Sequence, residues 1–151
     1  MACCYGVRVL ISFDECMKKG LIRNIAPSKE QALLSIDKSG KLLEEAKADL
    51  DDERYNSATV MAYLSILNSS KALLYRDGFR EKSHACVTRY LESKYSNVFS
   101  AEQINLLDHF RETRHDVQYD IEYMAGKESS KQIVEFAEEL LEKIEKIINS
   151  K

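Results

Sequence analysis

The chain has 151 residues, 44% of them hydrophobic and 31% charged, with one proline, five glycines and a formal net charge of -3. So little proline and glycine argues against a turn-rich β-sandwich or barrel, and the apolar content argues against global disorder. The weakly acidic balance excludes binding of nucleic acid by bulk positive charge, although it permits a focused anion site. The length predicts a single domain over residues 1–151.

The first 26 residues have the weakest pattern. We expect residues 1–12 to be a loosely attached segment and residues 13–21 to form a short helix that ends at Gly20. No apolar stretch reaches the roughly 18 residues of a membrane span, and Arg8 lies inside its apolar stretch, unlike the basic start of a secretory signal. We therefore expect a cytoplasmic protein without membrane association, in which the four cysteines are reduced thiols: Cys3, Cys4, Cys16 and Cys86.

Side chains that cap helices divide the next part of the chain. Ser28 and Gln31 have the capping-box spacing directly after Pro27, which predicts a helix over residues 28–50. Asp52 is expected to cap a second helix over 53–76. The second helix has apolar or small residues on so much of its surface that it is predicted to lie at the centre of a bundle.

Three further helices follow. The Asp77-Gly78 pair predicts the end of the second helix, and a third is expected over 82–95. Ser100 with Gln103 repeats the capping-box spacing and opens a fourth helix, which is expected to continue through Ile121 and Met124 and to close at Gly126.

The last helix is expected to start at Ser129, which has the same spacing to Gln132, and to run to about residue 148. No β-like alternation competes with the helical periodicity anywhere in the sequence. The prediction is an all-α, up-and-down bundle of four to five main helices with mostly antiparallel neighbours.

The sequence lacks the common catalytic signatures. There is no phosphate loop, no GxGxxG, no HExxH and no GxSxG. His84, His109 and His115 have no partners at metal-binding spacing, and no ExxH pair is present, which disfavours a di-iron bundle. No metal and no cofactor are predicted.

The densest polar cluster lies within the fourth helix, over residues 108–120. Arg111, Arg114, His115 and Tyr119 share one polar surface there, since Arg111 and His115, and His115 and Tyr119, are i,i+4 neighbours. Two arginines offer bidentate recognition of an anion, and histidine or tyrosine adds donors or a stacking face. From the residue pattern alone, a solvated helix face with ion pairs is the simpler interpretation.

This cluster resembles the motif of the HEPN superfamily (higher eukaryotes and prokaryotes nucleotide-binding domain), an arginine followed after four to six residues by a histidine. In residues 114–119 (RHDVQY), Tyr119 stands where the motif histidine would be. The spacing is similar to that of a small prokaryotic branch with Arg-x-x-Ala-Asp-Tyr, with Val-Gln in place of Ala-Asp. Residues 62–84 also resemble this branch in their small-residue helix, glycine turn and Lys-x-His segment. The resemblance covers about residues 13–148.

The resemblance implies a compact bundle of four or five helices that forms a homodimer, with the two arginine-motif helices facing one cleft. It also implies a partner, a minimal nucleotidyltransferase, with which many such proteins form a toxin–antitoxin-like module. Other members are metal-independent ribonucleases in which the arginine stabilises phosphate and the histidine performs acid–base chemistry.

The residues that the resemblance assigns to a nucleotide or RNA phosphate are Arg111, Arg114, His115 and Tyr119, with Lys82 and His84 as secondary candidates. By position alone, His84 is a packing or capping residue at the start of the third helix, and Tyr63 and Tyr75 are core residues of the second.

A ribonuclease would use Arg114, His115 and Tyr119 as its catalytic residues. Phenols titrate near pH ~10 and imidazoles near ~6.5, so tyrosine is the poorer proton shuttle at neutral pH. Binding without cleavage is therefore the prediction. A metal-independent ribonuclease and a structural protein-interaction bundle without a ligand are the alternatives.

Overall fold

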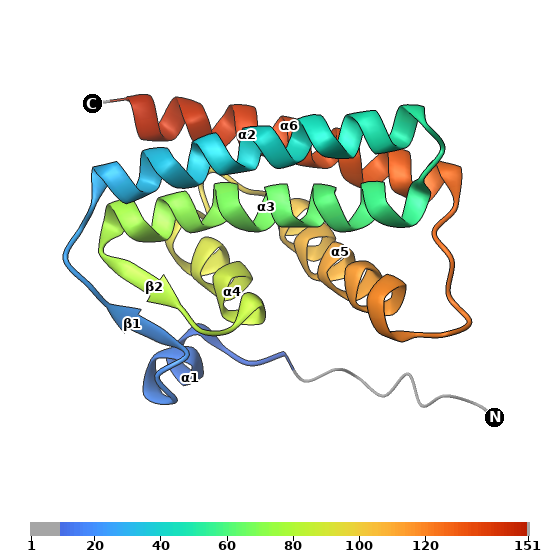
Figure 1. The fold of residues 1–151 in the computed structure, drawn as a ribbon. Coiled ribbons are helices and arrows are strands. Elements are labelled where there is room, and N and C mark those ends of the chain that lie inside the picture. Colours follow the sequence, from blue (N-terminus) through green and yellow to red (C-terminus); the bar gives the residue numbers. More distant parts are fainter. Residues whose placement is uncertain (1–9, 151) are drawn as a thin grey trace.

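The computed structural model describes residues 10–150 and shows a helical bundle with a small antiparallel sheet (Figure 1). In this part of the chain the elements are α1 (Phe13–Lys18), β1 (Ile22–Asn24), α2 (Lys29–Asp51), α3 (Tyr55–Asp77), β2 (Phe79–Glu81), α4 (His84–Lys94), α5 (Ala101–Tyr119) and α6 (Lys127–Asn149). The predicted all-α bundle is confirmed.

Helix α3 lies at the centre, as its sequence predicted. It packs against α2 and α6 on one side and against α4 and α5 on the other (Figure 1). Ser39 of α2 and Ser65 of α3 each donate a hydroxyl hydrogen bond to the other's backbone carbonyl, at 2.7 and 2.9 Å. Both serines are fully buried, and such small residues let the two helices approach closely.

The long helices are only partly antiparallel. Helices α2 and α3 run in opposite directions, as expected for neighbours joined by a short turn, whereas α6 runs in the same direction as α3 (Figure 1). Between α3 and α6 the chain passes through α4, α5 and their connections. It therefore returns to the end of the bundle where α3 starts, and α6 can run parallel to α3.

Local caps account for two of the predicted helix starts. The Ser28 hydroxyl accepts from the backbone N–H of Gln31 at 3.1 Å at the start of α2. At the start of α5, Ser100 and Gln103 form both hydrogen bonds of the capping box. Each cap satisfies backbone donors that have no partner within the helix.

The start of α3 differs from the prediction. Asp52 terminates α2 instead of capping α3, whose N-cap is Arg54. The turn is held by Asp49, whose carboxylate accepts from Arg54 Nη2 at 2.8 Å and from the Ser57 hydroxyl at 2.5 Å. Asp49 of the preceding helix therefore holds this turn, although no side chain caps the backbone at the start of α3.

The predicted end of the fourth helix and start of the last one were wrong. Helix α5 stops at Tyr119, because the Asp120 side chain accepts from the N–H of Glu122 at 2.9 Å and forms a turn. Ile121 and Met124 are exposed in the connection, at 99% and 74%.

Helix α6 starts before the predicted Ser129. Its N-cap is Gly126, whose N–H donates to the Ser129 hydroxyl at 3.2 Å. The neighbouring Ala125 N–H donates to Asn56 Oδ1 of α3 at 2.8 Å, which ties the connection to the bundle.

The structure adds a small two-stranded sheet that the sequence pattern does not reveal. Strand β1 pairs antiparallel with β2, with Ile22 opposite Glu81 and Asn24 opposite Phe79. Each strand has three residues, too few for an alternating pattern to be visible in sequence. The short helix expected over 13–21 is confirmed as α1. The expected loose segment 1–12 falls mostly on residues that lie outside the described ones.

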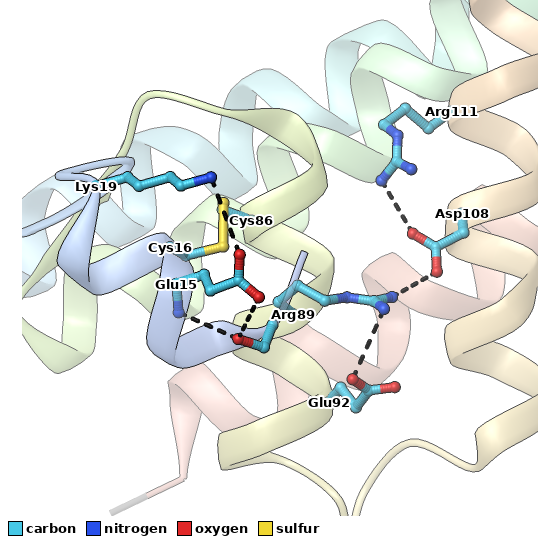
Figure 2. Close-up of a disulfide and its surroundings, with 9 residues drawn as sticks. Glu15, Cys16, Lys19, Cys86, Arg89, Glu92, Asp108 and Arg111 are labelled. Atoms are coloured by element: carbon cyan, nitrogen blue, oxygen red, sulfur yellow. Dashed lines mark hydrogen bonds and ion pairs between the residues drawn. A yellow bond between two sulfur atoms is a disulfide. The ribbon is translucent and has the colours of Figure 1, made fainter. Parts of the chain in front are cut away.

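A disulfide joins Cys16 of α1 to Cys86 of α4, which corrects the expectation of reduced thiols (Figure 2). The two cysteines are 70 residues apart in sequence, yet the fold brings their Cα atoms within 5.8 Å. Cys3 and Cys4 lie outside the described residues. Disulfides are uncommon in reducing compartments, so the cysteines no longer support the cytoplasmic expectation. Across residues 10–150, every helix is too short or too polar to cross a bilayer.

We predict that reducing the disulfide lowers the free energy of unfolding by about 2–4 kcal/mol, because the long unfolded loop regains conformational freedom. The measurement is denaturant unfolding with and without dithiothreitol. The Cys16→Ser/Cys86→Ser double variant is the matched control, and its stability should not respond to the reductant. Equal stability of the oxidised and reduced protein would contradict the prediction.

Candidate functional site

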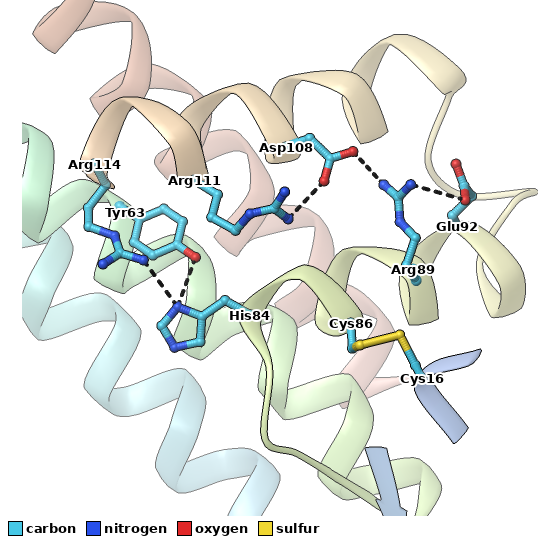
Figure 3. A network of polar contacts seen from close by, with 9 residues as sticks. All are labelled: Cys16, Tyr63, His84, Cys86, Arg89, Glu92, Asp108, Arg111 and Arg114. Atoms are coloured by element: carbon cyan, nitrogen blue, oxygen red, sulfur yellow. Dashed lines mark hydrogen bonds and ion pairs between the residues drawn. A yellow bond between two sulfur atoms is a disulfide. The ribbon is translucent and has the colours of Figure 1, made fainter. Parts of the chain in front are cut away.

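Arg114 on α5 is held by two residues from other helices, Tyr63 and His84 (Figure 3), and by Gln118 of its own helix. Its guanidinium lies 4.8 Å from the centre of the Tyr63 ring of α3, a cation–π contact. One nitrogen, Nη1, donates to Gln118 Oε1 at 2.9 Å, and Nη2 lies 3.3 Å from Nδ1 of His84 at the start of α4. The side chain is therefore oriented before it meets any ligand.

The contacts of His84 assign its tautomer. Its Nδ1 faces both Arg114 Nη2 and the Tyr63 hydroxyl, the latter at 3.2 Å. A guanidinium can only donate, so Nδ1 accepts and the proton of the neutral ring is on Nε2. Burial lowers the pKa of His84 below its ordinary value, and the positive charge of Arg114 lowers it further. Burial raises the pKa of Tyr63, which keeps its hydroxyl protonated as a donor.

Arg111 is positioned differently from Arg114. Its Nη1 donates to Asp108 Oδ1 at 2.9 Å, and the other oxygen of Asp108 accepts from Arg89 of α4 (Figure 3). The side chains of Asp108 and Arg89 are only 11% and 6% exposed. Asp108 therefore joins α4 to α5 and neutralises part of the charge that Arg111 brings.

The two aromatic candidates at the end of α5 lie at its surface. The rings of His115 and Tyr119 are 4.8 Å apart between centres, which confirms their predicted i,i+4 contact. Tyr119 is 66% exposed, so the group at the motif-histidine position faces outward. Lys82 is exposed just before α4.

A cavity of about 260 Å³ opens along this part of α5. The cavity is lined by the cations Arg111 and Arg114, by His115, and by the acidic residues Glu112 and Asp116. The cavity has donors for an oxyanion, but its acidic residues reduce the excess of positive charge.

The sequence located part of this site and missed the rest. Arg111, Arg114 and His115 meet at one cavity, whereas Tyr119 and Lys82 are not among its lining residues. Tyr63 and His84 contact Arg114, although their positions indicated core and packing residues. No local signal in the sequence pairs Tyr63 with an arginine 51 positions later, because only the packing of α3 against α5 brings them together. Within residues 10–150, no three His, Cys, Asp or Glu side chains gather as a metal site.

The fold and this geometry define an all-α bundle with an arginine-centred polar surface on one helix. A family model, the HEPN domain, matches residues 32–147, from α2 to α6. The chain belongs to the HEPN domain family, which makes it a nucleotide- or RNA-related module. No curated protein matches the sequence significantly.

We predict that Asp108→Ala destabilises the fold by about 3–5 kcal/mol, because it leaves Arg89 buried without its carboxylate. Denaturant unfolding measures the change. The control is Asp37→Ala, which removes an exposed i,i+4 partner of Lys41 and should cost less than about 0.5 kcal/mol. Similar losses in the two variants would contradict a structural role for Asp108.

Proposed function

We propose that this chain is a HEPN binding module for a nucleotide or RNA phosphate, that it forms a homodimer, and that it pairs with a minimal nucleotidyltransferase in a toxin–antitoxin-like system. The proposed phosphate-binding residues are Arg111, Arg114, His115 and Tyr119, with Lys82 and His84 as secondary contacts. The proposed location is the cytoplasm, because the proposed nucleotide or RNA ligand is found there, although the Cys16–Cys86 disulfide does not support it.

The observation that supports binding most strongly is the orientation of Arg114. Its guanidinium is stacked on Tyr63 and lies beside a cavity that also contains Arg111 and His115. A planar, oriented guanidinium recognises a phosphate with two parallel hydrogen bonds and loses little side-chain entropy in doing so.

Two features support binding without cleavage. The motif-histidine position holds Tyr119, whose ring lies against that of His115 in a tilted arrangement at the surface. The histidine whose side chain contacts the Arg114 guanidinium is His84, which accepts hydrogen bonds at Nδ1 and carries its proton on Nε2. The unprotonated nitrogen of this neutral ring, Nδ1, is already used as a hydrogen-bond acceptor. It is therefore not free to act as a general base beside Arg114.

Exposed apolar side chains next to the motif support the homodimer. Tyr119, Ile121 and Met124 follow the end of the motif helix and are exposed at 66%, 99% and 74%. Burial of such residues against a second copy would remove apolar surface from water and bring two Arg114 side chains towards one cleft. Two convergent arginines would also offset the weakly acidic charge of each chain.

We predict that Arg114→Ala weakens binding of adenosine monophosphate by about tenfold or more, because a hydrogen bond to a charged group contributes roughly 1.5–3 kcal/mol. Isothermal titration calorimetry measures the affinity. Arg23→Ala, which removes an exposed arginine on β1, is the control and should leave the affinity unchanged.

Co-purification with a nucleotidyltransferase encoded beside this chain tests the partner, and sedimentation tests the homodimer. No saturable nucleotide binding by the unaltered protein, together with sedimentation or melting that changes in Arg114→Ala, would instead support a structural bundle without a ligand.

A metal-independent ribonuclease is the second candidate, and the presence of His115 beside Arg114 in the cavity favours it. We expect no cleavage when the protein is incubated with structured or single-stranded RNA in EDTA. Cleavage that is lost in Arg114→Ala would establish the ribonuclease and contradict binding alone. Cleavage that persists in this variant would indicate a contaminating nuclease.

A further inference from the structure

Arg114 and the Tyr63 hydroxyl address the same atom, Nδ1 of His84, at 3.3 and 3.2 Å. Both are donors in this state, and a ring nitrogen has one lone pair to share between them. A ligand that takes the Nη2 hydrogen directed at His84 therefore leaves Nδ1 with Tyr63 as its remaining partner among the described residues. Unlike the guanidinium, a hydroxyl can also accept a hydrogen bond.

We propose that His84 is the proton-coupled second cation of the Arg114 anion site. When an oxyanion such as a terminal phosphate takes the Arg114 donor, Nδ1 of His84 binds a proton from solvent. The new N–H group keeps this proton and donates a hydrogen bond to the Tyr63 oxygen. This inference rests on the proposed function. It adds two points: His84 is the group that makes binding depend on pH, and the site favours a doubly charged ligand.

The charge balance of the cavity makes this proton important. Arg111 is paired with Asp108, and Glu112 and Asp116 line the same cavity as Arg114. The site therefore has little positive charge in excess while His84 is neutral. A proton on His84 adds one unit of positive charge within hydrogen-bond distance of Arg114, which matches a dianion better than a monoanion.

The charged groups around His84 determine whether anion binding becomes tighter or weaker as the pH falls. Arg114 and Arg111 on α5 and Lys71 on α3 disfavour the imidazolium, whereas Glu81 on β2 favours it. Burial and these cations lower the pKa of His84 in the free protein. An anion beside Arg114 cancels part of the repulsion and raises that pKa. Binding must therefore take up a proton and become tighter as the pH falls through this range.

Sulfate is the appropriate probe, because it remains a dianion between pH 5 and 8. Phosphate changes between monoanion and dianion within this range. The three histidine rings can be followed separately by NMR during pH titrations with and without sulfate. We expect the pKa of His84 to lie below 6.5 in the free protein and to rise by about half to one unit with sulfate. Because one pKa unit is a factor of ten, the affinity for sulfate should be about three- to tenfold higher at pH 5 than at pH 8.

Matched variants separate His84 from the other titrating groups. His84→Asn places an amide near Nδ1 that does not titrate, and it should abolish most of the pH dependence. Tyr63→Phe keeps the ring under Arg114 but removes the hydroxyl oxygen that would accept from protonated His84. It should therefore reduce the pH dependence of sulfate binding. His109→Asn removes a histidine that is not among the lining residues of the cavity and should preserve the pH dependence.

The outcomes are distinct from those of the proposed function. Sulfate binding that requires Arg114 but leaves the pKa of His84 unchanged would overturn this inference and leave the binding module intact. A pH dependence that disappears in His115→Asn and persists in His84→Asn would overturn it as well. Binding of sulfate and nucleotide that is unaffected by Arg114→Ala would contradict both proposals.

Discussion

The carboxylate of Asp108 fixes the relation between α4 and α5, and the candidate site depends on that relation. It accepts from Arg89 of α4 and from Arg111 of its own helix, and all three side chains are largely buried. Burial of a single charge is costly, so each of these groups is stable there only because its partners are present. The same contact holds the start of α4 beside Arg114, which places His84 next to the guanidinium (Figure 3).

The two arginines of the motif helix consequently have different roles. Arg111 serves the interface between helices, while Arg114 is supported by an aromatic face and a hydrogen-bond acceptor at the edge of a cavity. A bulk charge argument does not distinguish them, because the whole chain carries a net charge of -3. Local geometry does distinguish them, since Arg111 is paired with Asp108, and for this reason we propose Arg114 as the main contact for an anion.

Features of the fold that depend on neighbouring residues could be predicted from the sequence. The caps at Ser28 and Ser100 are local hydrogen bonds, and the apolar surface of α3 indicated its central position. The end of α5 could not be predicted in this way, since the apolar spacing continues to Met124 while the Asp120 turn stops the helix.

The disulfide and much of the site depend on long-range packing. Cys16 and Cys86 are brought together by α1 and α4, and the packing of α4 against α5 brings Arg89 to Asp108. An ion pair between Asp108 and Arg111 is expected from their i,i+3 spacing, but the buried contact with Arg89 is not. The i,i+4 pattern identified His115 and Tyr119 as neighbours, which the structure confirms. It could not show that Tyr63 and His84 reach Arg114 from two other helices.

The most direct test of this account follows the guanidinium groups themselves. NMR of the arginine Nε–Hε signals during a titration with adenosine monophosphate reports on Arg111 and Arg114 in one experiment. The account predicts a large, saturable shift of the Arg114 signal and a smaller change at Arg111, which remains with Asp108. An Arg114 signal that stays constant while nucleotide is added, or that moves no more than the exposed arginines, would contradict it.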